Sequence, residues 1–552
     1  MARKKNGGVS YQVGNNSTNQ QLLPMTLNAD EHLSTSALET WLWDAACAIR
    51  GNNDAPKYKD FILPLIFYKR LSDVFDDECS KYYEEYGGEE LARAIIEEDN
   101  RQALEDGRLP IVRFFIPGKY HWSRIRNHPK DDLGEFVTNA MRTVAILNPS
   151  LKGVIDVKDY NERQSGQRTL DDDPLYKLVE IISRHRLGLS NAEPDILGRA
   201  YEYLLRKFAE GQGQSAGEFY TPKEVGDLIA ELLNPRPRTR IYDPACGSGG
   251  LLIKARYLFE RQHPEDRSRA PQLYGQEWNP TTYAMAKMNM FLHDYIGATI
   301  AVGDTMRNPI FASKGAGLDT FDYVVANPMW NQKNYDETFY DGDTWKRFGY
   351  GTPPGNTADW GWLQLIHASL NEEGRAAIVL DTMAVSRGSS GQNSDRERDI
   401  RKQFVEKNLI ECVILLPENL FYNTSAPGII VLLNKAKSPE RKNQILLINA
   451  SRYFLKRKPK NELTSEGIIA VTEVYHSWET REKLSRVITV DEVRATDYNL
   501  SPSQFVHVSD SIVYRSLEVI MEDLAKARED RQKSDEELSK LLGDLGIDKA
   551  MR

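Results

Sequence analysis

The sequence predicts an α/β protein with an all-helical N-terminal domain, a central domain built on a seven-stranded sheet, and a C-terminal helical arm. Helical periodicity dominates from Leu33 to about Ile155, and short apolar runs alternate with helical segments from about residue 240. Continuous apolar strands separated by helices are typical of a largely parallel sheet covered on both faces. With 552 residues, the chain is also too long for one ordinary hydrophobic core, which indicates two or three domains.

The N-terminal part divides into a tail and a helical domain. Residues 1–30 are rich in Asn, Gln, Gly and Ser, and we expect a mobile tail there. The helical domain is expected over 31–170, where apolar side chains recur at helical spacing: Leu38, Leu42, Ala45, Ala46 and Ile49 in one stripe, and Phe61, Leu65 and Tyr68 in the next. Two more amphipathic helices are predicted within Asp171–Phe208, ahead of a glycine-rich bend at Gly211–Gly217.

Seven apolar runs predict the strands of the central domain, which we expect over 171–480. They are Arg240–Tyr242, Gln272–Gly275, Thr299–Val302, Phe321–Ala326, Ala376–Leu380, Cys412–Leu416 and Gly428–Leu433. The last two runs lack an intervening helix, because the link Pro417–Pro427 is loop-like. The sequence therefore predicts an antiparallel hairpin at one edge of the sheet.

Two apolar stripes mark the C-terminal segment, 481–552. They flank the charge-dense stretch Lys526–Glu537 and consist of Val513, Leu517, Ile520, Met521 and Leu524, then Leu538, Leu541, Leu542 and Leu545. Two interpretations are open: a helix packed on its own domain, or an arm whose stripes bury only against a partner.

Composition argues against membrane, secreted and metal-dependent classes. Apolar runs such as Gly428–Leu433 stop far short of the roughly 20 residues that span a bilayer. The basic start Met1–Lys5 leads into a polar stretch rather than an apolar signal core. The four cysteines lie far apart, without a CxxC pair or nearby histidines, so no metal site and no disulfide frame is expected. These features predict a cytoplasmic protein that does not bind a membrane.

The net charge constrains any role on nucleic acid. The chain has 71 basic and 80 acidic residues, a formal charge of −9. A protein that alone held many DNA phosphates would be more basic, because neutralising the backbone supplies most non-specific affinity. If DNA is the substrate, a local basic patch or another subunit must hold it.

The strongest local motif is the glycine-rich turn Asp243–Gly250 (DPACGSGG), between a short strand and a helix that begins near Leu251. Glycines let the backbone turn tightly and approach a ligand closely, with the helix N-terminus behind them. The motif is not the GxGxxG fingerprint, so we expect this helix to face the charged amino-acid part of a cofactor rather than a pyrophosphate. The candidate cofactor residues in the turn are Asp243, Gly247, Ser248 and Gly249.

Two acids follow the next two strands. Glu277 ends the second strand, where its carboxylate can accept both hydroxyls of a ribose, and Asp304 follows the third, where it can accept an adenine amino group. Both positions are carboxyl ends of parallel strands, where ligands of open α/β sheets bind. Either acid alone is more often a solvated loop residue or a helix cap. Together with the glycine turn, in this order, they favour a nucleoside-containing cofactor.

An aromatic segment precedes the glycine turn. Gly217–Lys223 (GEFYTPK) opens a helix, with Thr221 as the expected N-cap and Pro222 at the first helical position. Capping does not explain the two neighbouring aromatic residues, which suit a wall against the cofactor. The candidate cofactor residues of this segment are Glu218, Phe219, Tyr220, Thr221, Pro222 and Lys223.

The fourth strand delivers Asn327-Pro328-Met329-Trp330 to the same edge of the sheet. The exocyclic amino group of adenine is a poor nucleophile, because its lone pair is delocalised into the ring. The Asn327 side-chain oxygen and the Pro328 carbonyl can accept its two N–H groups and turn the lone pair toward a methyl donor, which is preorganised stabilisation of the transition state. Trp330 offers a flat face for a base flipped out of the duplex, and stacking returns roughly 1–3 kcal/mol. No metal and no covalent nucleophile is needed, and Cys246 is assigned a packing role.

With these motifs, the chain resembles the modification subunit of type I restriction–modification systems. The resemblance covers nearly the whole chain, from about Trp41 to the C-terminal helix. It rests on GEFYTPK, DPACGSGG, Glu277 and the tetrapeptide Asn327–Trp330, and more loosely on Trp41–Gly51, Tyr58–Asp73 and Leu416–Lys435.

The resemblance implies a Rossmann-like methyltransferase that uses S-adenosylmethionine to methylate N6 of adenine in double-stranded DNA. It also implies that sequence choice belongs to a separate specificity subunit, which usually binds two modification subunits, and that a restriction subunit can join the complex. A partner that holds much of the DNA accounts for the acidic charge, and in this family the C-terminal arm helps contact that partner. The basic segment Arg452–Lys460 can touch phosphates, although a solvated loop is the more common interpretation of such a run.

One departure from the family pattern leaves alternatives open. The family usually has Asn-Pro-Pro followed by Phe or Tyr, whereas this chain has Met329 and Trp330. Loss of a rigid proline puts the catalytic rate in doubt more than the reaction type. The alternatives are a catalytically idle scaffold that binds the cofactor and N4-cytosine methylation, although cytosine enzymes more often begin this motif with Ser. Protein glutamine N-methyltransferases share the motif but are shorter.

Overall fold

The computed structural model describes residues 35–49, 58–108, 110–112, 114–156, 158–164, 167–191, 200, 203–204, 221–293, 295, 297–313, 317–333, 335–389, 395–421, 424–458, 460–508 and 517–544. These residues form two compact units, the first from Met1–Thr221 and Pro235–Ala312 and the second from Pro222–Asn234 and Ser313–Arg552. The predicted tail 1–30 and glycine-rich bend 211–217 lie outside the described residues.

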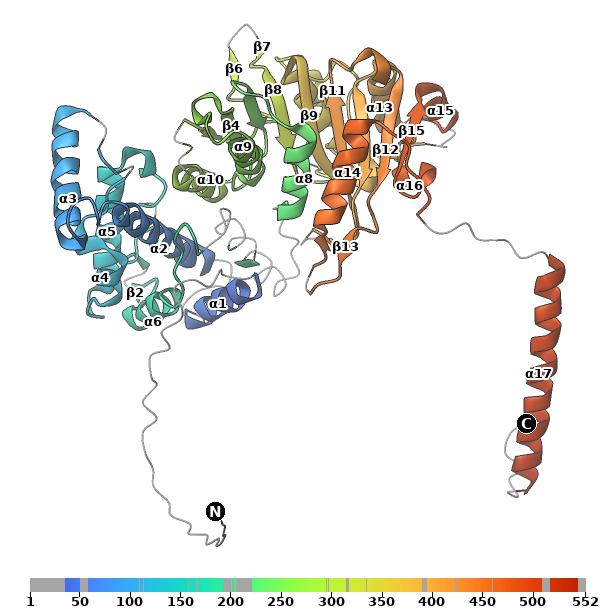
Figure 1. The fold of residues 1–552 in the computed structure, drawn as a ribbon, viewed down its shortest axis with the longest axis horizontal. Helices are drawn as coiled ribbons and strands as arrows, with labels where there is room; N and C mark the ends of the chain where they lie inside the picture. Colours follow the sequence, from blue (N-terminus) through green and yellow to red (C-terminus); the bar gives the residue numbers. More distant parts are fainter. Residues whose placement is uncertain are drawn as a thin grey trace, which may run out of the picture. The chain divides into compact units, whose positions relative to one another are not determined.

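The helical domain of the first unit confirms the predicted periodicity. Its helices are α1 (Thr35–Ala48), α2 (Tyr58–Ser80), α3 (Glu89–Asp106), α4 (Trp122–Arg126), α5 (Leu133–Leu147) and α6 (Asp172–Ile182), drawn in blue to cyan in Figure 1. The side chains of both predicted stripes are at most 2% exposed. The first of the two helices predicted within 171–208 is α6, and the second falls largely outside the described residues.

The first unit also contains three parallel strands. They are β3 (Arg240–Asp243), β4 (Gln272–Glu277) and β5 (Thr299–Val302), connected by α9 (Gly250–Gln262) and α10 (Pro280–Leu292). Helix α10 packs against α2, and the rings of Phe114 and Phe291 lie 5.1 Å apart. Met285, Met288 and Phe291 therefore belong to the same hydrophobic core as the helical domain.

The second unit contributes six strands: β8 (Phe321–Ala326), β9 (Leu370–Asp381), β10 (Ile410–Leu415), β11 (Gly428–Asn434), β12 (Gln444–Asn449) and β15 (Ser485–Thr489). Their order is β15-β12-β10-β11-β9-β8, and the order within the first unit is β3-β4-β5. All seven predicted strands are present. Strands β10 and β11 are buried at every position, as their continuous apolar runs require.

The position of the hairpin was predicted wrongly. Strands β10 and β11 pair antiparallel, as expected, but they do not form an edge, because β12 pairs parallel with β10 and β15 pairs antiparallel with β12. Since β8 and β9 are parallel and β11 is antiparallel to both β9 and β10, the carboxyl ends of β8, β9, β10 and β12 lie at one edge.

Helices cover the sheet of the second unit. Helix α8 (Lys223–Leu233) lies beside α14 (Ser465–Ser477) and contacts β9 (Figure 1). Helix α12 (Asp359–Ala368) packs on β9 and on α13 (Arg396–Glu406). None of the helices within the described ranges has both the length and the apolar character that crossing a membrane requires.

The C-terminal segment forms one long helix, α17 (Leu517–Asp544). The exposed fractions of Met521, Leu524 and Leu538 are 59%, 46% and 55%, and every described side chain of this helix is exposed. Exposed apolar side chains along one helix favour the arm over a helix packed on its own domain.

Candidate active site

The glycine turn follows β3 as predicted. Gly247 and Gly249 adopt left-handed backbone conformations, with φ of +54° and +84°. A Cβ atom at Gly249 would lie 2.6 Å from Cε of Met290, whereas a Cβ at Gly247 would meet nothing within 4 Å. The turn therefore leaves open space at Gly247, where a ligand can approach the backbone.

Glu277 binds this turn from the end of β4. Its Oε2 accepts a hydrogen bond from the Gly247 N–H at 2.9 Å, and its Oε1 accepts one from the Asn279 N–H at 2.8 Å. The structure thus brings Glu277 directly to the glycine turn.

Asp243 is almost completely buried at the end of β3. It is 1% exposed, and its Oδ1 accepts a hydrogen bond from the Ala245 N–H at 3.0 Å. Burial raises the pKa of Asp243 to about 8, and the nearby charge of Glu277 adds to the effect. A cation is the partner that would most readily return this carboxyl group to its ionised form.

Asp304 caps the turn that follows β5. Its Oδ1 accepts hydrogen bonds from the backbone N–H groups of Met306 (2.9 Å) and Arg307 (3.2 Å), and it remains half-buried. The backbone N–H of Gly303 donates to the Glu277 carbonyl at 2.8 Å, so the two acid-bearing strand ends are linked.

Three buried polar side chains that the sequence analysis missed hold these loops. Gln276 donates to the carbonyls of Gly303 and Asn308 at 3.2 and 2.9 Å. Asn289 donates to the carbonyl of Ser248 at 3.0 Å, and Thr305 donates to that of Pro244 at 2.6 Å. A buried amide or hydroxyl group requires such hydrogen bonds. These residues were missed because no local sequence pattern indicates which loop a side chain contacts.

Cys246 has the predicted packing position. It is 5% exposed, and burial raises the pKa of its thiol well above the usual value. A Cβ at Gly275 would lie 2.9 Å from its Sγ, so this sulfur fills the space against β4.

The upstream segment is described only in part. Glu218, Phe219 and Tyr220 lie outside the described residues. Helix α8 begins at Lys223, with Pro222 as the N-cap and no side-chain capping bond, so the expected N-cap at Thr221 was wrong by one residue. The Pro222 carbonyl accepts from the N–H groups of Val225 and Gly226, both at 3.0 Å, which defines the start of the helix.

In the second unit, β8 ends at the tetrapeptide Asn327–Trp330. Asn327 is 7% and Trp330 8% exposed. The indole Nε1–H of Trp330 donates to Oδ1 of Asn327 at 3.1 Å. The Trp330 ring packs edge-on against Phe421, with centroids 4.9 Å apart. Trp330 is therefore enclosed in this structure, and stacking of a base on its face stays a prediction.

A buried ion-pair network supports the residue that follows the tetrapeptide. Asn331 has a φ of +53°, and its backbone N–H donates to Oδ1 of Asp359 at 3.0 Å. Asp359 is fully buried and accepts from Nη2 of Arg387, whose Nη1 lies 3.0 Å from Oε2 of Glu397. Asn331 Nδ2 also donates to Oδ2 of Asp381 at 3.3 Å. Hydrogen bonds from Asn331 to helix α12 and to strand β9 thus fix the backbone just after the tetrapeptide.

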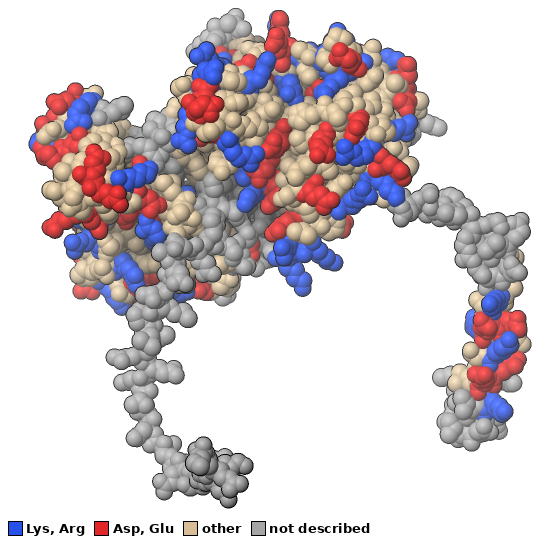
Figure 2. Space-filling view, in the orientation of Figure 1, with Lys and Arg blue, Asp and Glu red and all other residues tan. Residues whose placement is uncertain are grey.

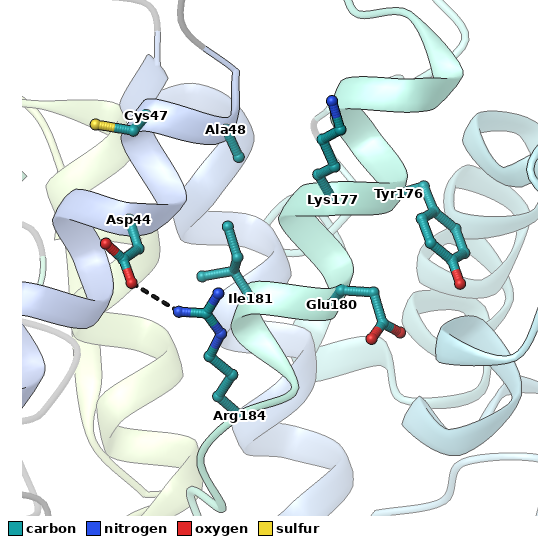
Figure 3. Close-up of a pocket in the computed structure, with 8 residues that line it drawn as sticks. All are labelled: Asp44, Cys47, Ala48, Tyr176, Lys177, Glu180, Ile181 and Arg184. Atoms are coloured by element: carbon teal, nitrogen blue, oxygen red, sulfur yellow. Dashed lines mark hydrogen bonds and ion pairs between the residues drawn. The ribbon is translucent and has the colours of Figure 1, made fainter. Parts of the chain in front are cut away.

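A separate pocket lies in the helical domain, between α1 and α6. It has a volume of about 470 Å³ and contains an ion pair between Asp44 and Arg184 at 2.6 Å (Figure 3). No candidate site residue lines it. Its other lining residues are Cys47, Ala48, Tyr176, Lys177, Glu180 and Ile181.

The helical domain and the α/β sheet domain define the class of an S-adenosylmethionine-dependent methyltransferase. Residues 192–512 match the family N-6 DNA Methylase, and residues 38–182 match the HsdM N-terminal domain. The chain therefore belongs to the N-6 DNA methylase family, and the predicted resemblance is confirmed. Family membership makes it an adenine-N6 DNA methyltransferase with S-adenosylmethionine as its cofactor.

Several relatives agree with this assignment. The chain is 36% identical to the type I restriction enzyme MjaVIII methylase subunit of Methanocaldococcus jannaschii, over 88% of this chain and 80% of the relative. It is 31% identical to the HindI methylase subunit of Haemophilus influenzae, over 75% and 93%. The type I restriction-modification system methyltransferase subunit of Streptococcus thermophilus superposes with a TM-score of 0.69 at 26% identity, over 86% of this chain and all of that one.

Proposed function

We propose that this chain is the modification subunit of a type I restriction–modification complex. In this proposal two copies bind one specificity subunit, which selects the DNA sequence, and a restriction subunit can join them. The similarity to methylase subunits of type I restriction enzymes, over 88% and 75% of this chain, supports the assembly. The exposed apolar side chains of α17 support an arm that contacts the specificity subunit.

We assign the cofactor contacts to the glycine turn and the two strand ends. S-adenosylmethionine supplies an electrophilic methyl group on a positively charged sulfonium. The open space at Gly247 accommodates the amino-acid part, and the buried Asp243 compensates its positive charge. Glu277 accepts the ribose hydroxyls, and Asp304 accepts the adenine amino group. Ser248, Gly249 and the segment 218–223 complete the assigned contacts.

We assign the target adenine to the tetrapeptide. Asn327 Oδ1 and the Pro328 carbonyl accept the two N–H groups of the flipped base, and the aromatic ring of Trp330 borders the base. The observation that carries this assignment is the hydrogen bond from Trp330 Nε1 to Asn327 Oδ1. It orients the amide so that the position of its oxygen is fixed before the substrate arrives.

Transfer of tritium from labelled S-adenosylmethionine to duplex DNA tests the proposal. The chain is assayed together with its specificity subunit, and the product is digested to nucleosides. We expect label in N6-methyladenine and none in N4-methylcytosine. Cofactor binding without any transfer would support the idle scaffold instead, the alternative that Met329 raises, and label in cytosine would contradict the assigned base.

A further inference from the structure

The basic segment 452–460 belongs to a small β-hairpin that the assigned function does not yet use. Strands β13 (Phe454–Leu455) and β14 (Glu462–Leu463) pair antiparallel, and we call residues 452–463 the basic hairpin. It follows the carboxyl end of β12 after a short turn. Within 452–460 there is no acidic residue, and five are basic: Arg452, Lys456, Arg457, Lys458 and Lys460. This density contrasts with a net charge of −9 for the whole chain.

The charges at the tip of the hairpin are available for a partner. Lys456, Arg457 and Lys458 are exposed, and Figure 2 shows blue atoms gathered where Figure 1 labels β13. Among the side chains that the structure describes, Lys456 and Lys458 form no ion pair. Arg457 lies 3.5 Å from Glu462, but both side chains are about half exposed, so the pair contributes little and can exchange for a stronger anion.

The base of the hairpin is firmly attached, unlike a simple solvated loop. Lys460 Nζ donates to Oδ1 of Asn419 and to the carbonyl of Thr424, both at 3.0 Å. The Asn461 N–H donates to the Asn419 carbonyl at 2.9 Å, and Asn461 Nδ2 donates to the Glu418 carbonyl at 3.0 Å. Four hydrogen bonds thus fix the hairpin to the loop between β10 and β11.

That same loop contacts the catalytic tetrapeptide. It contains Phe421, whose ring packs edge-on against Trp330 at 4.9 Å. The loop follows β10, the hairpin follows β12 and the tetrapeptide follows β8, and these carboxyl ends share one edge of the sheet. Ligands of α/β sheets bind at this edge. The basic hairpin is therefore held on the side of the sheet where the target base must be presented.

We propose that the basic hairpin binds the phosphate backbone of the duplex beside the flipped adenine. The inference rests on the proposed function for its substrate. Lysine and arginine on a rigid support contact phosphates without reading sequence, which suits a subunit that leaves sequence choice to a partner. A base extruded from the stack also needs its own backbone held, since flipping rotates the nucleotide about that backbone.

Charge-neutral variants of the complete complex test the proposal. Lys456→Gln/Lys458→Gln removes two charges from the tip and leaves Lys460 in place. The matched control, Lys407→Gln/Lys442→Gln, removes two exposed charges just before β10 and β12, at the opposite edge of the same sheet. Affinity for duplex DNA is measured by fluorescence anisotropy over a range of salt concentrations, alongside thermal midpoint, cofactor affinity and subunit association by analytical ultracentrifugation.

We expect the hairpin variant to bind DNA more weakly, whatever the sequence, and to lower the slope of log K against log salt by about 2, since each phosphate contact contributes about 0.9. Its cofactor affinity and thermal midpoint should equal those of the control. An unchanged salt slope would overturn the proposal, and so would unchanged DNA binding with weakened subunit association, which would place a protein partner on the hairpin. Failure of the wild-type complex to methylate adenine would contradict the proposed function instead, while anisotropy would still decide the role of the hairpin.

Discussion

The indole N–H of Trp330 donates a hydrogen bond to the side-chain oxygen of Asn327, three residues earlier in the same loop. An amide has two chemically different ends, and a donor on one side fixes which of them is the oxygen. Phenylalanine, which the family often has at this position, cannot make this bond. Trp330 therefore orients the group that we assign to the substrate.

Asn327→Ala should reduce methyl transfer nearly to background and leave the cofactor bound. The variant removes the acceptor for the adenine amino group, and loss of one preorganised group of this kind costs roughly 100- to 1,000-fold in rate. Tritium transfer and calorimetric titration with S-adenosylmethionine measure the two properties separately. Loss of cofactor binding together with transfer would contradict the role assigned to Asn327.

Trp330→Phe should lower the single-turnover rate roughly fivefold, because about 1 kcal/mol of hydrogen bonding is lost while an aromatic ring remains. The matched control is Trp122→Phe in the helical domain, where the indole N–H donates to Ser183 Oγ at 2.9 Å. Both variants should lose a little stability, but only the first should transfer methyl groups more slowly. Equal rates for the two would remove Trp330 from the orientation of Asn327.

Gly247→Asp should weaken cofactor binding without unfolding the protein. Aspartate tolerates a left-handed backbone better than most residues, and a Cβ at Gly247 meets no atom within 4 Å. The added side chain instead occupies the space assigned to the cofactor. Gly153→Asp is the control, because Gly153 also has a positive φ (+74°) and open space. Comparable affinities for S-adenosylmethionine in both variants would exclude the glycine turn from the site.

Cofactor binding at pH 7 should release protons from Asp243. In the free protein the pKa of this carboxyl is raised to about 8, so it is mostly protonated at pH 7. A bound cation favours the ionised form and lowers the pKa, which expels the proton. Calorimetry in two buffers of different ionisation enthalpy measures the release, and Asp243→Asn should reduce it.

The same raised pKa has a consequence for stability. A native carboxyl that holds its proton more tightly than the unfolded chain stabilises the fold fully at low pH, and this contribution is lost as the pH rises from about 4 toward 8. Asp243→Asn should therefore flatten the decline of the cofactor-free thermal midpoint over that range. A midpoint profile identical to that of the wild type would contradict the raised pKa.

Asp359→Ala should lower the free energy of unfolding by about 3–5 kcal/mol. The change leaves the charge of Arg387 without its fully buried partner and the Asn331 N–H without its acceptor. Asp359→Asn keeps an oxygen for Asn331, so its loss should be smaller. Urea denaturation compares the two, and equal losses would show that the contact with Asn331 does not contribute.

The sequence was a good guide to elements whose pattern is local. Strands such as β8 and β11 are buried on both faces, so their apolar runs identify them without knowledge of their neighbours. The sequence also indicated that the glycine turn and Glu277 lie together, because the carboxyl ends of parallel strands meet at one edge; their role in cofactor binding stays a prediction. The β10–β11 hairpin was wrongly predicted at the edge of the sheet, because the order in which strands pair depends on partners distant in sequence. Strand β12 has the run Ile445–Ile448 and was missed although its signal is local, whereas β15 is only partly buried.

The rest of the site depends on contacts that have no local signature. Asp359 of helix α12 accepts from the Asn331 N–H and is itself held by Arg387 from the turn after β9, and neither position is marked by spacing or composition. The contacts of Trp330 also had no local signal: its N–H donates to Asn327 and its ring packs against Phe421, while stacking of a base on it stays a prediction. Propensity and motif order therefore predict the element on which a residue lies. The contacts that its side chain makes depend on packing against residues distant in sequence.

Gly428, the first residue of β11, lies where the rings of Phe421 and Trp330 meet. A Cβ there would come within 2.6 Å of Phe421 and 3.0 Å of Trp330. The two rings therefore occupy the space that a side chain at position 428 would need. A substitution that adds a side chain at 428 therefore has to be accompanied by a shift of Phe421 and a smaller one of Trp330, so changes at these three positions are expected to depend on one another.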